Sequence, residues 1–533
     1  MILLPGQKPT LLKPTLLSPI NMRTFILYLL FGLPGTQLMA RQIISSDSIY
    51  LFKQTSRQLA WSHDGATHLI FNDFTNIARS QLYTGHEQGS FHKSQEAYRQ
   101  TVAGFHTDGV KKTGRFYLAG QFDFEKRWDD SLAWRNAGEY NEAQPYYFFA
   151  GKAGKFEKQL FNLSATATYN LWKKKLYLGM AGNYRYHWTT RSVDPRADSK
   201  EFSTRLSPEI TGRFGKNVLG AGLIWGRGSD ITSITYKNKD FNGNQTYIER
   251  NNFMSLGFGH IGKMDRYLNR YHETNGFLAS YATRFTNWEL QASGRYELRQ
   301  EDISLDTTST RNNHFLYAFL QQEKTLGNLL LTHNGSRNRQ QWELTFETES
   351  MLNQASEFNG TSYQYTASEI NLSYRQLWQK RTGISVEAGA GCDYKERFKE
   401  DIVAAHKHQL QVITPHVYAA LYRREPGKSA LSLSVMPSFR HTLTNELSVP
   451  KTQENYFTRG VVYTDYVYWQ KNSWGIASQF NFIEKENSKK HRLGCTVNIK
   501  YQQATNGSQT DLPALYLPSG SRWSAGASLN LYL

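Results

Sequence analysis

The chain has 533 residues and a formal net charge of +17, and it is 39% hydrophobic and 14% aromatic. Its mean hydropathy of −0.59 excludes a polytopic helical membrane protein of this size. The aromatic content argues against disorder and favours pleated sheet. A basic balance is compatible with an anionic membrane surface, an anionic solute or a nucleic acid.

An export signal is predicted within residues 1–40. Arg23 precedes an apolar run from Phe25 to Leu33, and Ala40 is a plausible last residue before cleavage. We therefore expect translation to start at Met22, so that residues 1–21 are an upstream extension that does not belong to the signal peptide. A membrane anchor is the alternative, but the run is shorter than the ~20 residues of a spanning helix. Because an exported chain does not meet nucleic acid, no nucleic-acid partner is predicted.

Residues 41–76 follow no strand pattern, and we expect either a periplasmic extension or a short plug that points into a barrel. From residue 77 onward, apolar and polar residues alternate. The clearest hairpins cover residues 161–188, with a lysine turn at 173–175, and residues 277–299, with a turn at 286–287. In each strand one face is apolar and the other is polar.

These alternating stretches run for about 10–15 residues, longer than ordinary strands and long enough to cross a bilayer. They predict an all-β fold, a transmembrane antiparallel up-and-down β-barrel over residues 77–533. The expected strand count is even and about 18, within 14–22. Residues 248–260 and 456–485 are included as less regular strands. With them the last strand runs in the wrong direction, so either one strand within 429–503 is wrong or one outer loop is very short.

The apolar faces are predicted to meet lipid, and a soluble sandwich with the apolar face inward is the disfavoured alternative. The opposite faces carry charged residues that are predicted to face the lumen. They are Arg185, Glu289, Arg295, Glu297, Arg299, Glu369 and Arg375. Two interpretations stay open: these charges pair with one another as polar filling, or they form a charged lining that selects solutes.

The final strand, SRWSAGASLNLYL, places Trp523 to Leu533 alternately on the apolar face. This ending resembles the closing strand of outer-membrane barrels, which implies recognition by the barrel-assembly machinery, although the last residue is Leu533 and the aromatic Tyr532 precedes it. Cys392 and Cys495 lie in phase with apolar residues, so we expect lipid-facing thiols and neither a disulfide nor a metal site.

Motifs for enzymes are not found: there is no GxSxG, HExxH, P-loop, CxxC or EF-hand loop. No catalytic, cofactor-binding or metal-binding residue is predicted. His406 and His408 could bind a metal, but solvated loop histidines are the expected alternative. A barrel hydrolase with dispersed catalytic residues stays open as a rival function.

A pattern near the first strands resembles a family of uncharacterised outer-membrane barrel proteins from Bacteroidota. The matching positions are Tyr83, Gly89, Phe91, His92, Gln95, Gly109, Lys111, Lys112 and Trp134. The resemblance implies an accessory barrel with a TonB-dependent receptor or a surface lipoprotein as partner. It implies no activity, and residues 41–76 are too short for the plug domain of a TonB-dependent receptor.

Together these features predict a barrel in the outer membrane of a Gram-negative cell, with lipid as its surroundings. The expected role is a pore or an accessory component of solute or nutrient uptake. A barrel hydrolase and a structural or adhesive barrel are the alternatives.

Overall fold

The computed structural model describes residues 46–263, 267–306, 315–380, 383–425, 427–485, 491–505 and 511–533. The predicted signal peptide and residues 41–45 lie outside these ranges. Within them, no helix is long and apolar enough to cross a membrane.

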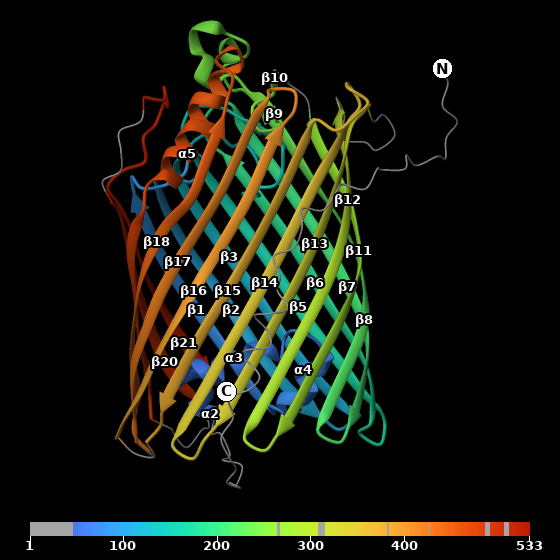
Figure 1. Ribbon diagram of the computed structural model, residues 1–533, viewed down its shortest axis with the longest axis vertical. Helices are drawn as coiled ribbons and strands as arrows, with labels where there is room; N and C mark the ends of the chain where they lie inside the picture. The colour runs from blue at the N-terminus through green and yellow to red at the C-terminus, as the bar shows by residue number, and fades with distance from the viewer. Residues whose placement is uncertain are drawn as a thin grey trace. The chain divides into compact units, whose positions relative to one another are not determined.

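Eighteen antiparallel strands of the described chain form one closed barrel, so the predicted fold class and strand count are confirmed (Figure 1). Closure comes from pairing of the first strand with the last, from Arg79 opposite Tyr532 to Gly89 opposite Arg522. Every backbone group along this seam therefore has a partner, as a bilayer requires. The barrel strands are β1 (Ile77–Gly89), β2 (Arg99–Thr113), β3 (Phe116–Leu132), β5 (Gly154–Trp172), β6 (Leu176–Arg191), β7 (Arg196–Phe214), β8 (Asn217–Thr235), β11 (Tyr267–Phe285), β12 (Trp288–Asp306), β13 (Phe315–Asn334), β14 (Asn338–Ala355), β15 (Tyr363–Trp378), β16 (Gly383–Asp401), β17 (His406–Arg424), β18 (Ala430–Ser448), β19 (Ser473–Ile483), β20 (Arg492–Ala504) and β21 (Ser521–Tyr532).

The alternation in the sequence becomes the two faces of the barrel wall. On β21, Leu529 points outward and is 68% exposed, while the neighbouring Ser528 and Asn530 point inward and are buried. Cys392 and Cys495 are free thiols, and their strand neighbours opposite are Leu372 and Leu529. The outer surface is therefore apolar and the lumen polar.

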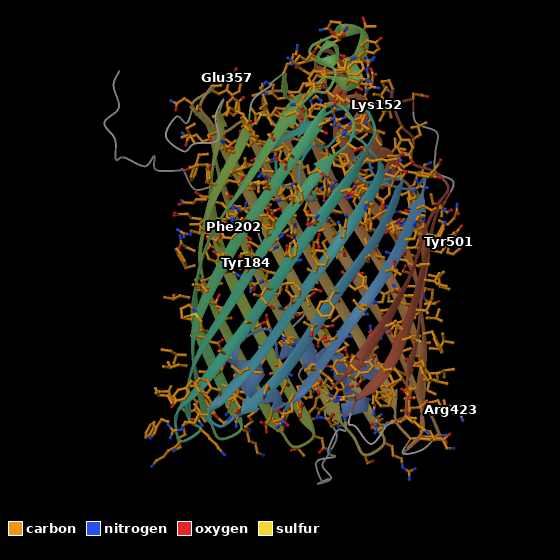
Figure 2. The ribbon with its side chains drawn as sticks, turned by 180° about the vertical axis from the view of Figure 1, so that it is seen from behind. Lys152, Tyr184, Phe202, Glu357, Arg423 and Tyr501 are labelled. Atoms are coloured by element: carbon orange, nitrogen blue, oxygen red, sulfur yellow. The ribbon has the colours of Figure 1, made fainter. Side chains whose placement is uncertain are left out.

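Aromatic side chains mark two levels on the outer surface. Near the short turns, Trp288 stacks on Trp342 at 5.6 Å between ring centroids. Higher on the wall, Tyr184 packs against Phe202 at 5.6 Å, and Tyr501 lies on another part of the wall at a similar level (Figure 2). Such paired bands border the hydrocarbon layer in outer-membrane barrels, where the apolar zone is about 25 Å tall.

Two predicted barrel strands are wrong. Residues 248–260 contain β9 (Phe253–Leu256), which pairs with β4 (Tyr146–Phe149) and β10 (Ile261–Lys263) in a separate small sheet. Residues 456–470 are helical, with a π-helical turn η4 (Thr458–Val462) leading into α5 (Tyr463–Gln470) before β19. The rest of the predicted stretch, residues 473–483, is the barrel strand β19.

Several strands are longer than predicted, because β7, β8 and β12 extend through residues expected to be loops. Each of these strands has 19 residues, about twice what a bilayer crossing needs. Beyond the upper aromatic level the wall has polar surroundings on both sides. The alternation that identifies a membrane strand is lost there.

The two ends of the barrel differ. One end carries the short turns, such as residues 173–175 and 286–287, and the C-terminus (Figure 1). Inside this end lie three short helices, α2 (Ser46–Leu51), α3 (Lys53–Trp61) and α4 (Ala66–Asn72), which we call the plug. The other end carries the long connections, including the 3₁₀ segments η1 (Lys239–Phe241), η2 (Gln245–Arg250) and η3 (Lys451–Gln453). The small sheet β4–β9–β10 and the η4–α5 helix, which we call the cap, lie at this long-loop end.

Candidate functional site

The lumenal face of β16 is buried at both ends and exposed in the middle. Near the short turn Glu387 is 0% exposed, and near the cap Arg397 and Asp401 are 2% and 1% exposed. Between them the side chains of Asp393 and Lys395 are 46% and 28% exposed. A side chain that points into a closed barrel is exposed only where a water-filled space lies before it. The lumen therefore contains a central chamber.

Strands across the barrel have the same profile. On β6, Tyr177 and His187 are buried, whereas the side chain of Arg185 between them is 41% exposed. On β7, Arg205 is partly exposed between the buried Ser199 and Ser207. Since β6 and β16 are 8 positions apart in the ring of 18 strands, they are nearly opposite. The chamber thus extends across the lumen.

A cavity of about 630 Å³ lies in this chamber, beside β13 to β18. Its polar lining includes the carboxylates of Glu347, Glu369 and Asp393, and Tyr468 and Trp469 of α5 border it. Ligand pockets for small molecules commonly have volumes of about 300–1,000 Å³. The cavity is therefore large enough for a small solute.

The chamber wall holds its charges in pairs. Glu297 lies 2.7 Å from Arg205 and 2.9 Å from Arg295, so two guanidinium groups share one carboxylate. Lys324 pairs with Glu347 at 2.5 Å on the next strands. Lys395 pairs with Glu369 at 2.6 Å. The lining is strongly polar, but most of its charges have a partner of opposite sign.

All seven residues that the sequence predicted to face the lumen lie on lumenal faces. Five line the chamber, namely Arg185, Arg295, Glu297, Arg299 and Glu369. The other two lie beside the plug: Glu289 accepts a hydrogen bond from Gln58, and the carbonyl of Arg375 accepts one from Gln54. Arg205, Lys324, Glu347, Asp393 and Lys395 also line the chamber but were not singled out. These residues also alternate with the apolar residues of their strands, so the same pattern could have identified them.

A wall carboxylate caps the last plug helix. Glu209 accepts hydrogen bonds from the backbone N–H groups of Ala66 at 2.9 Å and Thr67 at 3.2 Å, and from the Thr67 hydroxyl at 2.8 Å. The residue before α4 is Gly65, which has no side chain to cap the helix. The barrel therefore supplies the acceptor that a helix start normally takes from its own chain.

Further polar contacts fasten the plug to the wall. Arg57 pairs with Glu343 at 2.8 Å, and Lys53 donates to Gln479 at 2.7 Å. His68 is fully buried, 3.2 Å from Gln291 and edge-on to Trp61. Burial lowers the pKa of His68, so its ring is held neutral.

Below these contacts, an apolar ring of the wall surrounds the plug near the short turns. It receives plug residues in two groups: Ile49, Leu59, Leu69 and Ile70 pack with Val110, Tyr117 and Tyr177, and Leu51 and Phe52 pack with Leu377, Tyr418 and Tyr422. These contacts bury apolar side chains of the plug against the wall. The plug thus lies at the floor of the chamber.

The cap packs both against the wall and on itself. Phe148 and Met254 are completely buried in a cluster with wall residues such as Leu268, Ile303 and Tyr317. The Phe149 ring, also completely buried, lies 4.9 Å from that of Phe457 at the start of the η4–α5 helix. Asp401 at the end of β16 accepts three backbone hydrogen bonds, from Phe258, Gly259 and His260, at 2.8–2.9 Å. The cap is therefore a packed structure tied to the wall.

The expectation that His406 and His408 are solvated loop residues is wrong. Both are buried at the start of β17. His406 lies 3.1 Å from the Thr458 hydroxyl and His408 lies 2.8 Å from the Asn445 side chain. His406 joins the wall to the cap, whereas His408 contacts a neighbouring wall strand, because the segment folds as strand and not as loop. In the part of the chain that is described, no group of three or more His, Cys, Asp or Glu residues is placed to hold a metal ion.

The profile of the Family of unknown function (DUF6850) matches residues 66–533, from the start of α4 to the end of the barrel. The chain belongs to this family. The match thus includes the helix that Glu209 caps and every barrel strand. A comparison with curated protein sequences finds no match.

Several solved outer-membrane proteins are similar to this member of the DUF6850 family in architecture. The ferric citrate transporter FecA, unliganded, has 9% identity and a TM-score of 0.40 over 86% of this chain and 79% of its own. BauA, the ferric preacinetobactin receptor from Acinetobacter baumannii, has 8% identity and a TM-score of 0.34 over 86% and 80%. A FadL homologue from Pseudomonas aeruginosa has 11% identity and a TM-score of 0.31 over 88% and 92%. Identities this low concern fold alone.

Proposed function

We propose that this protein is an outer-membrane uptake barrel in which a small polar solute occupies the lumenal chamber. The observation that carries the proposal is the exposure profile of the lumenal faces, which are buried at both ends and open in the middle. A chamber with paired charges suits a polar solute better than an apolar one.

The orientation in the membrane follows from the connections. In outer-membrane barrels the short turns face the periplasm and the longer loops face outward. The plug then closes the periplasmic end and the cap closes the outer end. Because both ends are filled by the chain itself, passage requires the plug or the cap to move, and the barrel is gated.

Conductance in planar bilayers tests the gated barrel. Three proteins are compared: the mature chain, a variant without residues 46–72, and a variant that also has residues 455–470 replaced by a Gly/Ser linker of equal length. We expect the first to be silent and the last to conduct in discrete steps. Steady conductance by the intact chain would contradict gating, and silence of the doubly opened variant would contradict a transport role for the lumen.

A thiol reporter tests which end closes the chamber. Thr345→Cys, in a background with Cys392→Ala and Cys495→Ala, places one thiol in the chamber lining. We expect slow reaction with a charged methanethiosulfonate in the intact chain and fast reaction after removal of residues 46–72. Leu344→Cys, on the outward face, is the matched control and should not respond to the plug. Equal rates with and without the plug would contradict its role as floor.

A further inference from the structure

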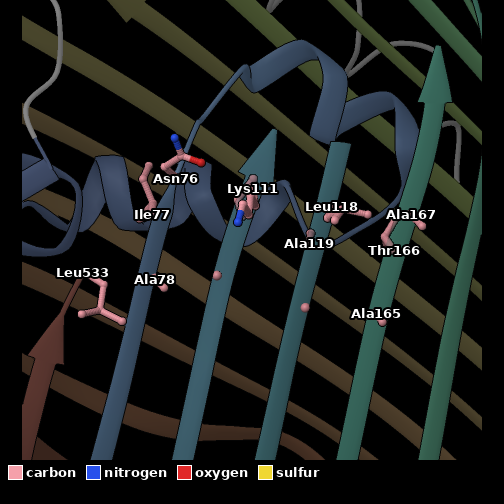
Figure 3. Close-up of a pocket in the computed structure, with 13 residues that line it drawn as sticks. Asn76, Ile77, Ala78, Lys111, Leu118, Ala119, Ala165, Thr166, Ala167 and Leu533 are labelled. Carbon is pink, nitrogen blue, oxygen red and sulfur yellow. The ribbon is translucent and has the colours of Figure 1, made fainter. Parts of the chain in front are cut away.

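An apolar groove of about 810 Å³ runs along the outer surface of the wall near the short turns, across β1, β2, β3 and β5 (Figure 3). The outward residues at its base are small, so the surface is recessed. They are Ala78, Gly109, Gly120, Ala165 and Ala167. Lys111 lies at the end of the groove that meets the turn between β2 and β3 (Figure 3).

A second groove of about 570 Å³ continues the first across β5 to β8 and shares Ala167 with it. Phe116 and Tyr169 line the second groove and pack together with 5.0 Å between ring centroids. On the other side of the barrel, outward positions at comparable depth include large side chains such as Phe346 and Leu372 and small ones such as Ala388 and Ala419. The two recesses lie next to each other on this part of the wall.

The turns that border these grooves are basic and contain no acid. Residues 111–116, 172–176 and 214–217 carry the exposed cations Lys111, Arg115, Lys173, Lys174, Lys175 and Lys216. Arg115 donates to the hydroxyl of Tyr169 at 3.2 Å, which holds its guanidinium beside the ring pair. Lys112 is engaged separately, by Asp73 at 3.0 Å.

The short turn between β17 and β18, across the barrel, differs in charge balance. Between β17 and β18, Glu425 pairs with Arg423 at 3.3 Å and with Lys428 at 2.5 Å. Basic groups there are partly neutralised by a neighbour, whereas those beside the grooves are not. An anion at the membrane surface would therefore be attracted to the grooved side.

We propose that the grooved side of the wall binds an anionic glycerophospholipid, with its acyl chains in the two grooves and its phosphate against Lys111, Arg115 and residues 173–175. The apolar recesses match two hydrocarbon chains, and the adjacent cations match the phosphate group. The proposal rests on the orientation proposed above, which places these turns at the periplasmic leaflet.

Native mass spectrometry of the detergent-solubilised mature chain tests this site with phosphatidylglycerol and phosphatidylcholine of equal chain length. We expect one phosphatidylglycerol adduct that persists at collision energies at which phosphatidylcholine is lost. A variant with glutamine at Lys111, Arg115, Lys173, Lys174 and Lys175 should bind it at least about tenfold more weakly. The matched control carries Arg337→Gln, Lys380→Gln, Arg423→Gln, Arg424→Gln and Lys428→Gln, all at short turns of the other side, and should retain the adduct.

A second variant fills the grooves and leaves the charges intact. Ala165→Phe with Ala167→Phe places rings on the outward face, where lipid normally accepts them, and should also remove the adduct. The site would be overturned if the control variant lost the phosphatidylglycerol adduct equally. It would also be overturned if both the glutamine variant and the phenylalanine variant retained the adduct. Because the readout is bound lipid and not solute flux, its failure is distinguishable from failure of the proposed transport role.

Discussion

Cap and plug close the same lumen by different means. The cap also packs on the wall, but its own segments contact one another through completely buried rings such as Phe149, and it has its own three-stranded sheet. The plug consists of helices of 6, 9 and 7 residues, each too short to be stable alone in water. Its folded state depends on acceptors and apolar side chains that the wall supplies. A closure that folds only in place is the easier one to release, which favours the plug as the moving gate.

The largest expected effect is on the cap. Phe149→Ala removes a fully buried ring and should destabilise the cap by about 3–5 kcal/mol. Hydrogen exchange of residues 133–153 and 450–470 should accelerate while the plug stays protected. Phe346→Ala, an outward residue, is the control and should leave both closures unchanged. Loss of plug protection in Phe149→Ala would show that the two closures are coupled.

A smaller effect is expected at the plug. Glu209→Ala leaves the backbone N–H groups of Ala66 and Thr67 without acceptors, which should weaken packing of the plug by about 1–3 kcal/mol. Proteolysis within residues 46–72 should become faster, with the cap unaffected. Glu369→Gln is the matched control, since Glu369 pairs with Lys395 in the chamber and not with the plug. Equal proteolysis of both variants would contradict the capping role.

Acid should also loosen the plug. Burial lowers the pKa of His68, so a released plug binds a proton more readily than a packed one. The packed state is therefore fully favoured above the usual pKa of 6.5 and loses stability as the pH falls below it. The negative charges of Asp64 and Glu209 raise the pKa of His68 and so oppose the effect of burial. They therefore limit how much stability the packed plug loses in acid. His68→Gln should flatten the pH dependence of proteolysis within residues 46–72 between pH 7 and pH 5, and an unchanged profile would assign it to another group.

The smallest effect is expected at strongly acidic pH in the loop that joins the wall to the cap. Glu139 of this loop, before β4, lies 3.2 Å from Arg127 and 3.5 Å from Lys158 of the wall. Burial alone would raise the pKa of Glu139, but Lys158, Arg127 and Arg135 outweigh it and lower that pKa to about 2. The ionised Glu139 carboxylate therefore stabilises the folded state at pH values above its usual pKa of 4.5. This stabilisation disappears as the pH falls toward 2. Glu139→Gln should reduce cap protection at pH 7 and make it less dependent on pH over that interval. Hydrogen exchange of residues 133–153 measures it, and an identical loss in the variant would exclude Glu139 as the cause.

The barrel could be predicted because its wall separates two solvents. Lipid outside and water inside impose a period of two on each strand, so the hairpin at 161–188 and the closing strand at 521–532 are legible in the sequence. The same period identified lumenal residues such as Arg295 and Glu369. It could not show which of them would pair, because Arg205 and Glu297 are 92 positions apart.

By itself, the sequence determined the fold class, the face that residues take in the alternating part of each strand, and the position of the closing strand. Tertiary structure decided the rest. The first part of the strand stretch expected at 456–485 became a helix within the cap, where period-two alternation has no lipid to enforce it. The plug gained its place through contacts such as Ala66 with Glu209, 143 residues away. The local alternation of residues reflects the solvent on each side of the wall. Closure of the lumen instead depends on contacts between residues far apart in the sequence, which only the completed barrel brings together.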